Sequence, residues 1–205
     1  MATLDAPREA ARLPNTPEAA LVRPNEDAAL AEQARDGDPQ AFAALYDRYL
    51  QQVYRYVYYR IREVEEAEDV TSEVFFRALR AMPRYQPRQP FLAWLYRIAR
   101  NAVIDRARGE RPRVSFEDAL AHPDAGEHIV DPDAAILATD RRSRLRTALG
   151  NLTEEQQEVV ILRFVEGLSA EEVGKIMGKR AGTVRGLQFR ALQSLKKHIT
   201  PEDLR

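Results

Sequence analysis

The sequence predicts an all-α protein made of two small helical domains that are joined by a flexible acidic linker. Apolar residues recur at intervals of three and four over most of the chain, as they do on one face of an α-helix. No stretch of useful length alternates polar and apolar residues, which is the pattern of a half-buried strand. Between the two predicted domains, residues 109–133 contain GERP, AHPDAG and VDPD, whose prolines and glycines favour a linker over regular structure.

The size and composition of the chain fit this division. Its 205 residues, 44% hydrophobic and 31% charged, suffice for one ordinary domain or two small ones. The absence of cysteine excludes disulfides and thiolate metal sites. No apolar run approaches the roughly 20 residues that span a bilayer, and the N-terminus lacks the apolar segment of a signal peptide. We therefore expect a cytoplasmic protein with no membrane insertion.

The first predicted domain covers residues 27–108 and contains four helices. Residues 1–26 precede it and are predicted to be a disordered tail, because they are rich in Ala, Pro and charge without a sustained period. The segment AALAEQARDG is predicted to be a short helix that Gly37 stops. Asp38 and Pro39 then suit the N-cap and first position of a long amphipathic helix. Its expected buried residues are Phe42, Leu45, Tyr46, Tyr49, Val53, Tyr56, Val57 and Ile61.

The third and fourth helices of this domain flank a proline-rich loop. The third is predicted from about Glu65 to Met82, ended by Pro83, with Val70, Val74, Phe75 and Ala78 buried. The fourth is predicted from Phe91 to Arg108. Its buried stripe is predicted to be Phe91, Leu95, Ile98 and Ala102, with Trp94 and Tyr96 as core or boundary aromatic residues.

The second predicted domain covers residues 134–200. A helix is expected from Ala134 to Leu149, followed by three more. Thr153 with Gln156, and Ser169 with Glu172, have the spacing of capping boxes, and Gly178 suits the end of the helix that Ser169 opens. A longer basic helix is expected to begin near Thr183. The order of a short helix, a glycine turn and a longer basic helix is that of a helix-turn-helix motif. Its expected core residues are Val173, Ile176, Val184, Ala191 and Leu195.

Charge is distributed unevenly behind a net charge of only -1. Residues 81–108 hold six arginines and one acid, residues 109–140 hold two arginines and eight acids, and residues from 141 onward hold thirteen basic and eight acidic residues. Such a basic–acidic–basic chain is able to carry two anion-binding surfaces. On the fourth helix, Arg97, Arg100, Asn101 and Arg108 lie opposite the buried stripe. A solvated face is the plain alternative, but arginines fit phosphates and Asn fits base edges.

Basic and polar residues also gather around the start of the second helix of the helix-turn-helix. A helix-turn-helix protein that binds the DNA major groove makes its base and phosphate contacts at the start of this helix. Two helices joined by a Gly turn are also common in proteins that bind no DNA, so the number of such side chains is what favours DNA binding. They are Lys179, Arg180, Arg185, Gln188 and Arg190.

Read together, these stretches resemble the ECF (group IV) sigma factors of bacterial RNA polymerase. DPQAFAALYDRYLQQVYRYVYYRI, AEDVTSEVFFRALRAMPRY and FLAWLYRIARNAVIDRAR are similar to conserved region 2 of that family. LTEEQQEVVILRFVEGLSAEEVGKIMG and GTVRGLQFRALQSLKK are similar to region 4. The resemblance implies a region 2 domain that binds core polymerase and opens the -10 promoter element. It also implies a region 4 helix-turn-helix that reads the -35 element, in a cytoplasmic, nucleoid-associated protein.

The resemblance implies roles for single residues. Residues that would contact the -10 element, in the loop Pro83 to Pro90 and the helix after it, are Arg84, Tyr85, Gln86, Arg88, Arg97, Arg100 and Asn101. Residues that would contact the -35 element are Arg180, Thr183, Arg185, Gln188 and Arg190. Residues that would dock on the clamp coiled coil of the largest polymerase subunit are Glu68, Asp69, Glu73 and Phe75. The other implied partners are the flap of the second-largest subunit, promoter DNA and an anti-sigma factor.

The chain departs from the family pattern around the helix-turn-helix. Lys179 stands where the family usually has an aliphatic residue, and the recognition helix reads Arg185 to Arg190 as RGLQFR. The buried leucine is therefore expected at Leu187, and the orientation of Phe189 is left open. The linker matches in position the family's connector through the RNA-exit region. The net charge of -6 over residues 109–140, which include the linker, suits either a basic channel or a plain solvated tether.

Other classes of function fit less well. His122, Asp124, His128, Asp131 and Asp133 of the linker resemble a metal cluster only in composition, since no helix or strand fixes them, so no metal or cofactor is expected. No Gly-rich phosphate loop, cysteine or G-x-S-x-G supports an enzyme. Two alternatives remain: a stand-alone helix-turn-helix regulator with an N-terminal interaction domain, and a helical adaptor without DNA contacts. The regulator would bind its operator without polymerase.

Overall fold

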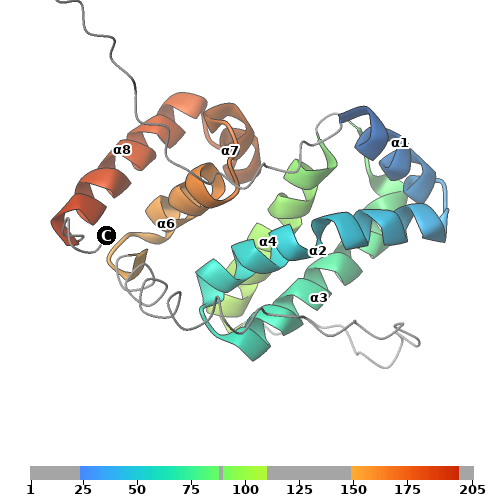
Figure 1. Ribbon diagram of the computed structural model, residues 1–205, viewed down its shortest axis with the longest axis horizontal. Coiled ribbons are helices and arrows are strands. Elements are labelled where there is room, and N and C mark those ends of the chain that lie inside the picture. The colour runs from blue at the N-terminus through green and yellow to red at the C-terminus, as the bar shows by residue number, and fades with distance from the viewer. Residues whose placement is uncertain (1–23, 88–89, 110–148, 199–205) are drawn as a thin grey trace, which may run out of the picture.

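The computed structural model describes residues 24–87, 90–109 and 149–198, and its regular structure in these ranges is entirely helical. The N-terminal half consists of α1 (Pro24–Arg35), α2 (Pro39–Ile61), α3 (Val64–Ala81), the short η1 (Met82–Arg84) and α4 (Phe91–Ala107). The C-terminal half consists of α6 (Glu154–Val160), the π-helical turn η3 (Ile161–Val165), α7 (Ala170–Met177) and α8 (Ala181–His198). The predicted all-α class is confirmed. Figure 1 shows the two halves side by side, with α1 and α8 at opposite ends.

Local sequence signals account for several helix ends. The Asp38 carboxylate accepts hydrogen bonds from the backbone N–H groups of Gln40 and Ala41, and Pro39 takes the first position of α2. Both predicted capping boxes are present, at Thr153 and Ser169. Gly178 adopts φ +67°, a left-handed conformation that favours glycine at a helix end. These predictions are confirmed.

The first helix begins earlier than predicted. Residues 24–26, assigned above to the tail, form the first turn of α1, where Pro24 has no N–H to leave unpaired and Glu26 and Asp27 suit the positive end of the helix dipole. Asp27 is buried, and its carboxylate accepts hydrogen bonds from Arg48 and the Tyr49 hydroxyl of α2. The predicted helix from Ala134 lies outside the described residues except for Leu149, as does the linker except for Gly109. The predicted domain limits remain predictions.

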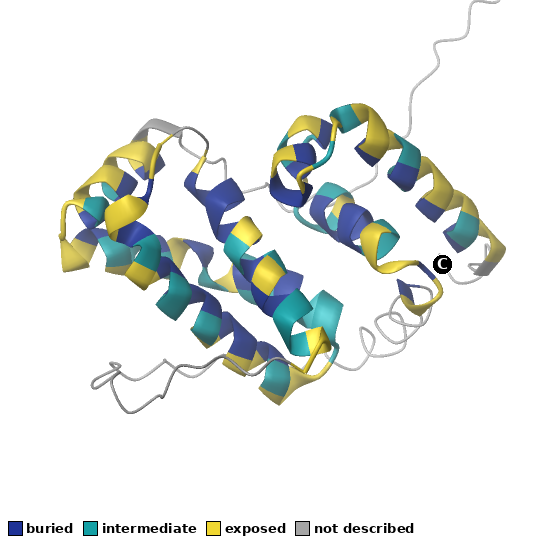
Figure 2. Ribbon diagram, turned by 180° about the vertical axis from the view of Figure 1, so that it is seen from behind, coloured by how far each residue is buried: buried dark blue, intermediate teal, exposed yellow. Residues whose placement is uncertain are grey.

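The fourth helix is buried on more than the one predicted stripe. Ile98 is only half-buried, whereas Leu92, Ala93, Ala99 and Val103 are buried together with both Trp94 and Tyr96. The reason is that α4 contacts α2 and α3 on one side and α7 of the C-terminal half on another. A single buried face was therefore the wrong expectation. Figure 2 shows dark, buried positions around α4 where the two halves meet.

Candidate nucleic-acid interface

The helix-turn-helix is built around a very close approach of backbone to backbone. Gly174 in α7 faces the turn, and a Cβ atom placed on it would lie 2.6 Å from the carbonyl oxygen of Lys179. The Lys179 N–H donates to the Gly174 carbonyl at 2.8 Å, which closes the turn. Lys179 also pairs with Glu155 of α6 at 2.8 Å. The predicted core residues of the motif are buried, and so is Leu187.

The predicted -35 residues lie on or beside the first half of α8, and most are exposed. Arg180, Thr183, Arg185 and Arg190 are exposed. Arg185 pairs with Glu171 of α7 at 2.6 Å, and both side chains remain more than half exposed. A surface ion pair of this kind contributes little free energy, so a phosphate is able to replace the carboxylate. No acidic residue occurs anywhere in α8.

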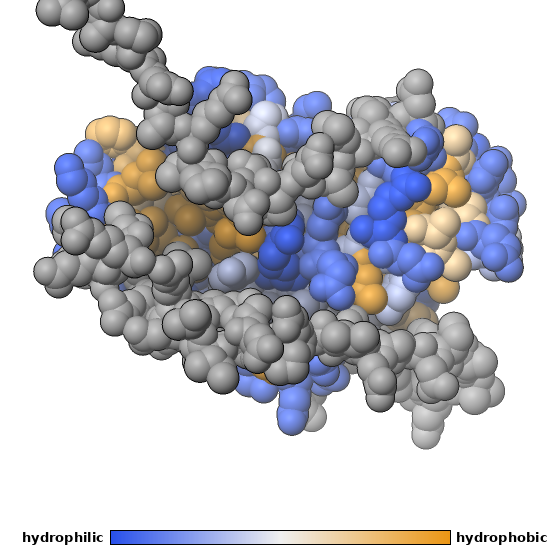
Figure 3. Space-filling model, viewed as in Figure 1, coloured by the Kyte–Doolittle hydropathy of each residue, from blue (hydrophilic) through white to orange (hydrophobic). Residues whose placement is uncertain are grey.

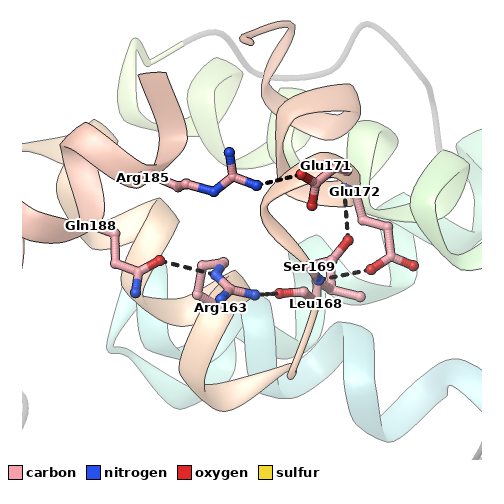
Figure 4. Close-up of polar contacts among 7 residues, drawn as sticks. All are labelled: Arg163, Leu168, Ser169, Glu171, Glu172, Arg185 and Gln188. Atoms are coloured by element: carbon pink, nitrogen blue, oxygen red, sulfur yellow. Dashed lines mark hydrogen bonds and ion pairs between the residues drawn. The ribbon is translucent and has the colours of Figure 1, made fainter. Parts of the chain in front are cut away.

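Gln188 is the exception among the predicted -35 residues. It is half-buried, and its side-chain oxygen accepts a hydrogen bond from Arg163 Nε at 3.1 Å. Arg163 also donates to the carbonyl of Leu168, next to the Ser169–Glu172 capping box (Figure 4). Gln188 is thus held to the start of α7, whereas Arg185 reaches Glu171 near by (Figure 4).

Two exposed apolar residues of α8 complete this surface and were not among the predicted contacts. Phe189 is 64% exposed and Leu192 is 43% exposed. Figure 3 shows apolar atoms among hydrophilic ones on the face over α8. The sequence held a signal for Phe189, because it stands four residues after Arg185 and next to Arg190. Once Leu187 takes the buried position, Phe189 is left on the outward side of the helix.

The predicted -10 residues divide into exposed and occupied groups. Arg84, Gln86, Arg97 and Asn101 are exposed. Arg88 lies outside the described residues.

Tyr85 and Arg100 are already engaged. The Tyr85 ring is buried against Phe91 and Trp94, with ring centroids 5.8 and 5.1 Å away, so the ring is not on the surface of the predicted -10 loop. Burial also raises the pKa of the Tyr85 hydroxyl. Arg100 Nε lies 2.7 Å from Glu158 Oε1 of the C-terminal half.

A polar network joins α2 and α4 to the C-terminal half. Arg55 donates two parallel hydrogen bonds to the Glu166 carboxylate, at 2.8 and 2.7 Å, and the Tyr96 hydroxyl donates a third at 2.7 Å. Tyr56 donates to Glu158 at 3.5 Å. Burial raises the pKa of the Glu158 carboxyl, with Arg100 acting in the opposite direction. Burial likewise raises the pKa values of Tyr56 and Tyr96.

The predicted polymerase-docking residues do not form one exposed row. Glu68 and Asp69 are exposed on α3, but Glu73 pairs with Arg77 and is half-buried. Phe75 is buried and packs edge-to-face on Tyr46 at 4.7 Å. It therefore lies in the core, as its place in the buried stripe of α3 already indicated.

The exposed apolar side chain of this part of α3 is Leu79, which is 49% exposed. Phe76 is half-buried, with the Arg80 guanidinium 5.8 Å from its ring centre. Both follow Glu68 and Asp69 on α3, and neither was among the predicted docking residues. Asp69, Phe76 and Arg80 are spaced by seven and four residues, so the sequence already indicated that they lie on one face of α3.

Metal and membrane sites are not indicated by the part of the chain that the structure describes. No group of three or more His, Cys, Asp or Glu residues there is placed to hold a metal ion. No described helix is long and apolar enough to cross a bilayer. The His and Asp residues of the linker lie outside these ranges.

Comparison with known proteins identifies two family models that match separate parts of the chain. The family model described as Sigma-70 region 2 matches residues 45–113, and the one described as Sigma-70, region 4 matches residues 148–197. The chain is 42% identical over 178 residues to the ECF RNA polymerase sigma factor BldN of Streptomyces coelicolor, covering 86% of this chain and 66% of BldN. It is 39% identical to the ECF RNA polymerase sigma factor SigD of Mycobacterium tuberculosis, over 84% of this chain and 83% of SigD.

A solved structure shares the arrangement as well. CnrH, in complex with the cytosolic domain of CnrY, matches with a TM-score of 0.66 and 26% identity, over 84% of this chain and 96% of CnrH. The two sigma-70 regions occur in order: the first covers most of α2 and all of α3 and α4, and the second covers the helix-turn-helix. This chain therefore belongs to the ECF family of RNA polymerase sigma factors.

Proposed function

We propose that this chain joins core RNA polymerase and directs it to promoters whose -35 element is read by α8 and whose -10 element is opened by α4 and the loop before it. The exposed cationic start of α8, set on a helix-turn-helix, is the observation that carries the proposal. Arg180 directly precedes α8, Arg185 and Arg190 follow along it, and the helix contains no acid that would repel a phosphate. The stand-alone regulator is set aside because it gives no role to the region 2 bundle.

The -35 surface combines charge with an apolar side chain. Arg180, Arg185 and Arg190 provide phosphate or guanine contacts, and Thr183 provides a hydroxyl beside them. Phe189 stands between these cations and is suited to contact the methyl group of a thymine. Gln188 is held by Arg163, so its part is to position the helix unless DNA binding releases it.

The -10 surface is proposed to hold an unpaired strand. Arg97 and Asn101 lie one turn apart on α4 and are exposed, and Arg84 and Gln86 extend the surface into the loop. Unpairing a base costs a few kcal/mol, which cationic contacts to phosphates and a base pocket are able to offset. Since Tyr85 is buried, its proposed part is to support the loop from beneath.

The partners follow from this role. Glu68 and Asp69, together with the exposed Leu79, form the proposed contact with the clamp coiled coil of the largest polymerase subunit. The C-terminal half is proposed to bind the flap of the second-largest subunit. An anti-sigma factor is a further proposed partner, and CnrH was solved bound to the cytosolic domain of CnrY. We propose no catalytic activity and a cytoplasmic, nucleoid-associated location.

One substitution and its control test the -35 surface in the assembled holoenzyme. Arg190→Ala should lower promoter binding and reduce its salt dependence by about one counterion. Lys196→Ala removes an exposed cation further along α8 and serves as the matched control, with a smaller loss. If both variants reduce promoter binding equally, the start of α8 is not the reading surface.

The double variant Arg97→Ala/Asn101→Ala tests strand opening. It should reduce the permanganate reactivity of unpaired thymines at the -10 element while leaving the affinity for core polymerase unchanged. Arg35→Ala, which removes an arginine from α1, serves as the control and should open DNA normally. Equal loss of polymerase binding and strand opening in the double variant would contradict the assignment of this face.

A further inference from the structure

The loop that is proposed to capture a base is supported by a cluster of four aromatic rings. The Tyr85 ring centroid lies 5.8 Å from that of Phe91 and 5.1 Å from that of Trp94, and the Phe91 and Trp94 centroids are 5.4 Å apart. Tyr49 of α2 completes the cluster, with its ring 5.7 Å from Phe91. All four residues are buried. Because Tyr85 follows η1 and Phe91 begins α4, the cluster fixes the loop at both of its ends.

The helix α1 reaches this cluster through one buried carboxylate. Asp27 is 3% exposed, and it accepts one hydrogen bond from the Tyr49 hydroxyl and another from the Arg48 guanidinium. A nitrogen of Arg48 also lies 3.7 Å from a carboxylate oxygen of Glu26. Carboxylates are seldom buried unless they are paired, and both partners of Asp27 come from α2. Asp27 therefore holds the hydroxyl end of Tyr49, whose ring packs in the cluster.

The other buried side chains that the structure describes on α1 are small. They are Ala31 and Ala34, with Leu30 half-buried beside them. An alanine side chain removes little apolar surface from water, so apolar packing alone holds this helix weakly. The helix nevertheless contacts η1 and α4 as well as α2, at the end of the molecule that lies far from α8 (Figure 1). The polar contacts of Asp27 are therefore the main attachment that sets the position of α1.

The hydroxyl of Tyr85 lies close to α1 as well. Burial raises the pKa of this hydroxyl, and the negative charges of Glu32 and Asp27 raise it further. Both carboxylates belong to α1, whereas the Tyr85 ring packs on residues of α4. Tyr85 thus lies between α1 and α4, and α1 meets the start of the loop both directly and through Tyr49.

We infer that α1 is a brace for the -10 loop and that Asp27 is the positioning residue of this brace. Asp27 holds Tyr49, Tyr49 packs on Phe91, and Phe91 packs on Tyr85 at the start of the loop. A loop that is already ordered binds an unpaired base more tightly, because binding does not have to order the loop at the same time. Asp27 acts through the cluster and contacts no DNA. The inference rests on the function proposed above for this loop.

The single tryptophan of the chain reports on the brace. Trp94 is the only tryptophan in the sequence, and it is 8% exposed within the cluster. The variant Asp27→Ala leaves the Tyr49 and Arg48 donors without this acceptor, which loosens the cluster. Acrylamide quenching of Trp94 fluorescence in the free, full-length chain should therefore increase. Asp27→Asn keeps an oxygen that accepts a hydrogen bond, so it should restore most of the protection.

A matched control separates the brace from a general loss of stability. Thr71→Val also removes a buried polar group, but the Thr71 hydroxyl donates to the Ala67 carbonyl within α3, at 2.6 Å. Its quenching should equal that of the wild-type chain. Circular dichroism verifies that each variant is folded. If Asp27→Ala does not fold, Tyr49→Phe takes its place, because it removes only the hydroxyl that Asp27 accepts, and quenching should again increase.

Base capture is measured in the assembled holoenzyme. The probes are single-stranded oligonucleotides with the non-template -10 sequence of a promoter whose start site run-off transcription has fixed, each lacking one base. In the wild type, the missing base at the captured position should weaken binding about tenfold, which is the contribution of one stacked base. Asp27→Ala should bring this ratio towards unity while its affinity for core polymerase stays unchanged, and Thr71→Val should keep the wild-type ratio. General destabilisation would instead weaken binding to every oligonucleotide alike.

The outcomes separate the brace from the function on which it rests. Unchanged Trp94 quenching in the folded Asp27→Ala variant, or an equal increase in Thr71→Val, would overturn the brace. A wild-type ratio at the captured position that Asp27→Ala retains would also overturn it, and the proposed role of the loop would stand. If no missing base weakens the binding of the wild-type holoenzyme, the loop captures no base, and its proposed function fails together with the brace.

Discussion

The substitution Gly174→Ala should destabilise the C-terminal half, although alanine normally stabilises a helix. Within α7 the change would ordinarily gain about 1 kcal/mol, the difference in helix propensity between the two residues. Here the new Cβ would lie 2.6 Å from the Lys179 carbonyl oxygen and 3.5 Å from the Ala181 nitrogen. Both neighbours are backbone atoms of the turn, so the turn itself has to move. Overpacking of this kind costs about 1–3 kcal/mol, and because the atoms met are backbone we expect the upper end, which leaves a net loss of about 2 kcal/mol.

Urea unfolding of the two matched glycine variants measures this effect. Gly186→Ala makes the same chemical change inside α8, where a Cβ meets nothing within 4 Å. It should raise the free energy of unfolding by about 0.5–1 kcal/mol. The two variants should therefore shift stability in opposite directions. If Gly174→Ala is as stable as the wild-type chain, the close approach at the turn is not what the structure shows.

Three further predictions concern the N-terminal half. Asp38→Ala removes the N-cap of α2 and should lower the free energy of unfolding by about 1 kcal/mol, and an unchanged urea midpoint would contradict the cap. Leu45→Ala empties a fully buried site and should cost about 2–5 kcal/mol; a loss below 1 kcal/mol would show that the site is not in the core. Burial raises the pKa values of Tyr56 and Tyr96 above the unfolded value of about 10, so the folded state retains these protons. The free energy that these two buried hydroxyls contribute to folding is therefore fully present below pH 10, and it is lost as the pH rises above that value. Tyrosinate absorbance should show these two residues ionising only as helix content falls, and their ionisation in the folded protein would contradict the burial.

The sequence predicted the helices well where the signals were local. Asp38 with Pro39, the two capping boxes and Gly178 act through neighbouring backbone groups, so their spacing alone carries the information. The buried residues of the helix-turn-helix, including Leu187, followed from helical periodicity in the same way. The start of α1 was missed because a proline followed by acids also fits a disordered tail.

The functional surfaces were harder to predict, because contacts between distant segments decide which of their side chains are exposed and which are already paired. Arg100 was assigned to DNA, but nothing local indicates that Glu158, far along the chain, pairs with it. Tyr85 stands in a proline-rich loop, and only the packing of Phe91 and Trp94 places its ring in the core. Phe75 differs from these two, because its helical periodicity already predicted the burial that the structure shows, whereas the family resemblance assigned it to the polymerase contact.

Transcription from defined promoters tests the central claim most directly. Core RNA polymerase is incubated with genomic promoter fragments, with and without the purified chain, and the run-off products are sized. The account predicts products with fixed start sites only when the chain is present, and fewer of them with Arg190→Ala than with Lys196→Ala. Failure of the chain to co-elute with core polymerase, together with identical products in its presence and absence, would contradict the account.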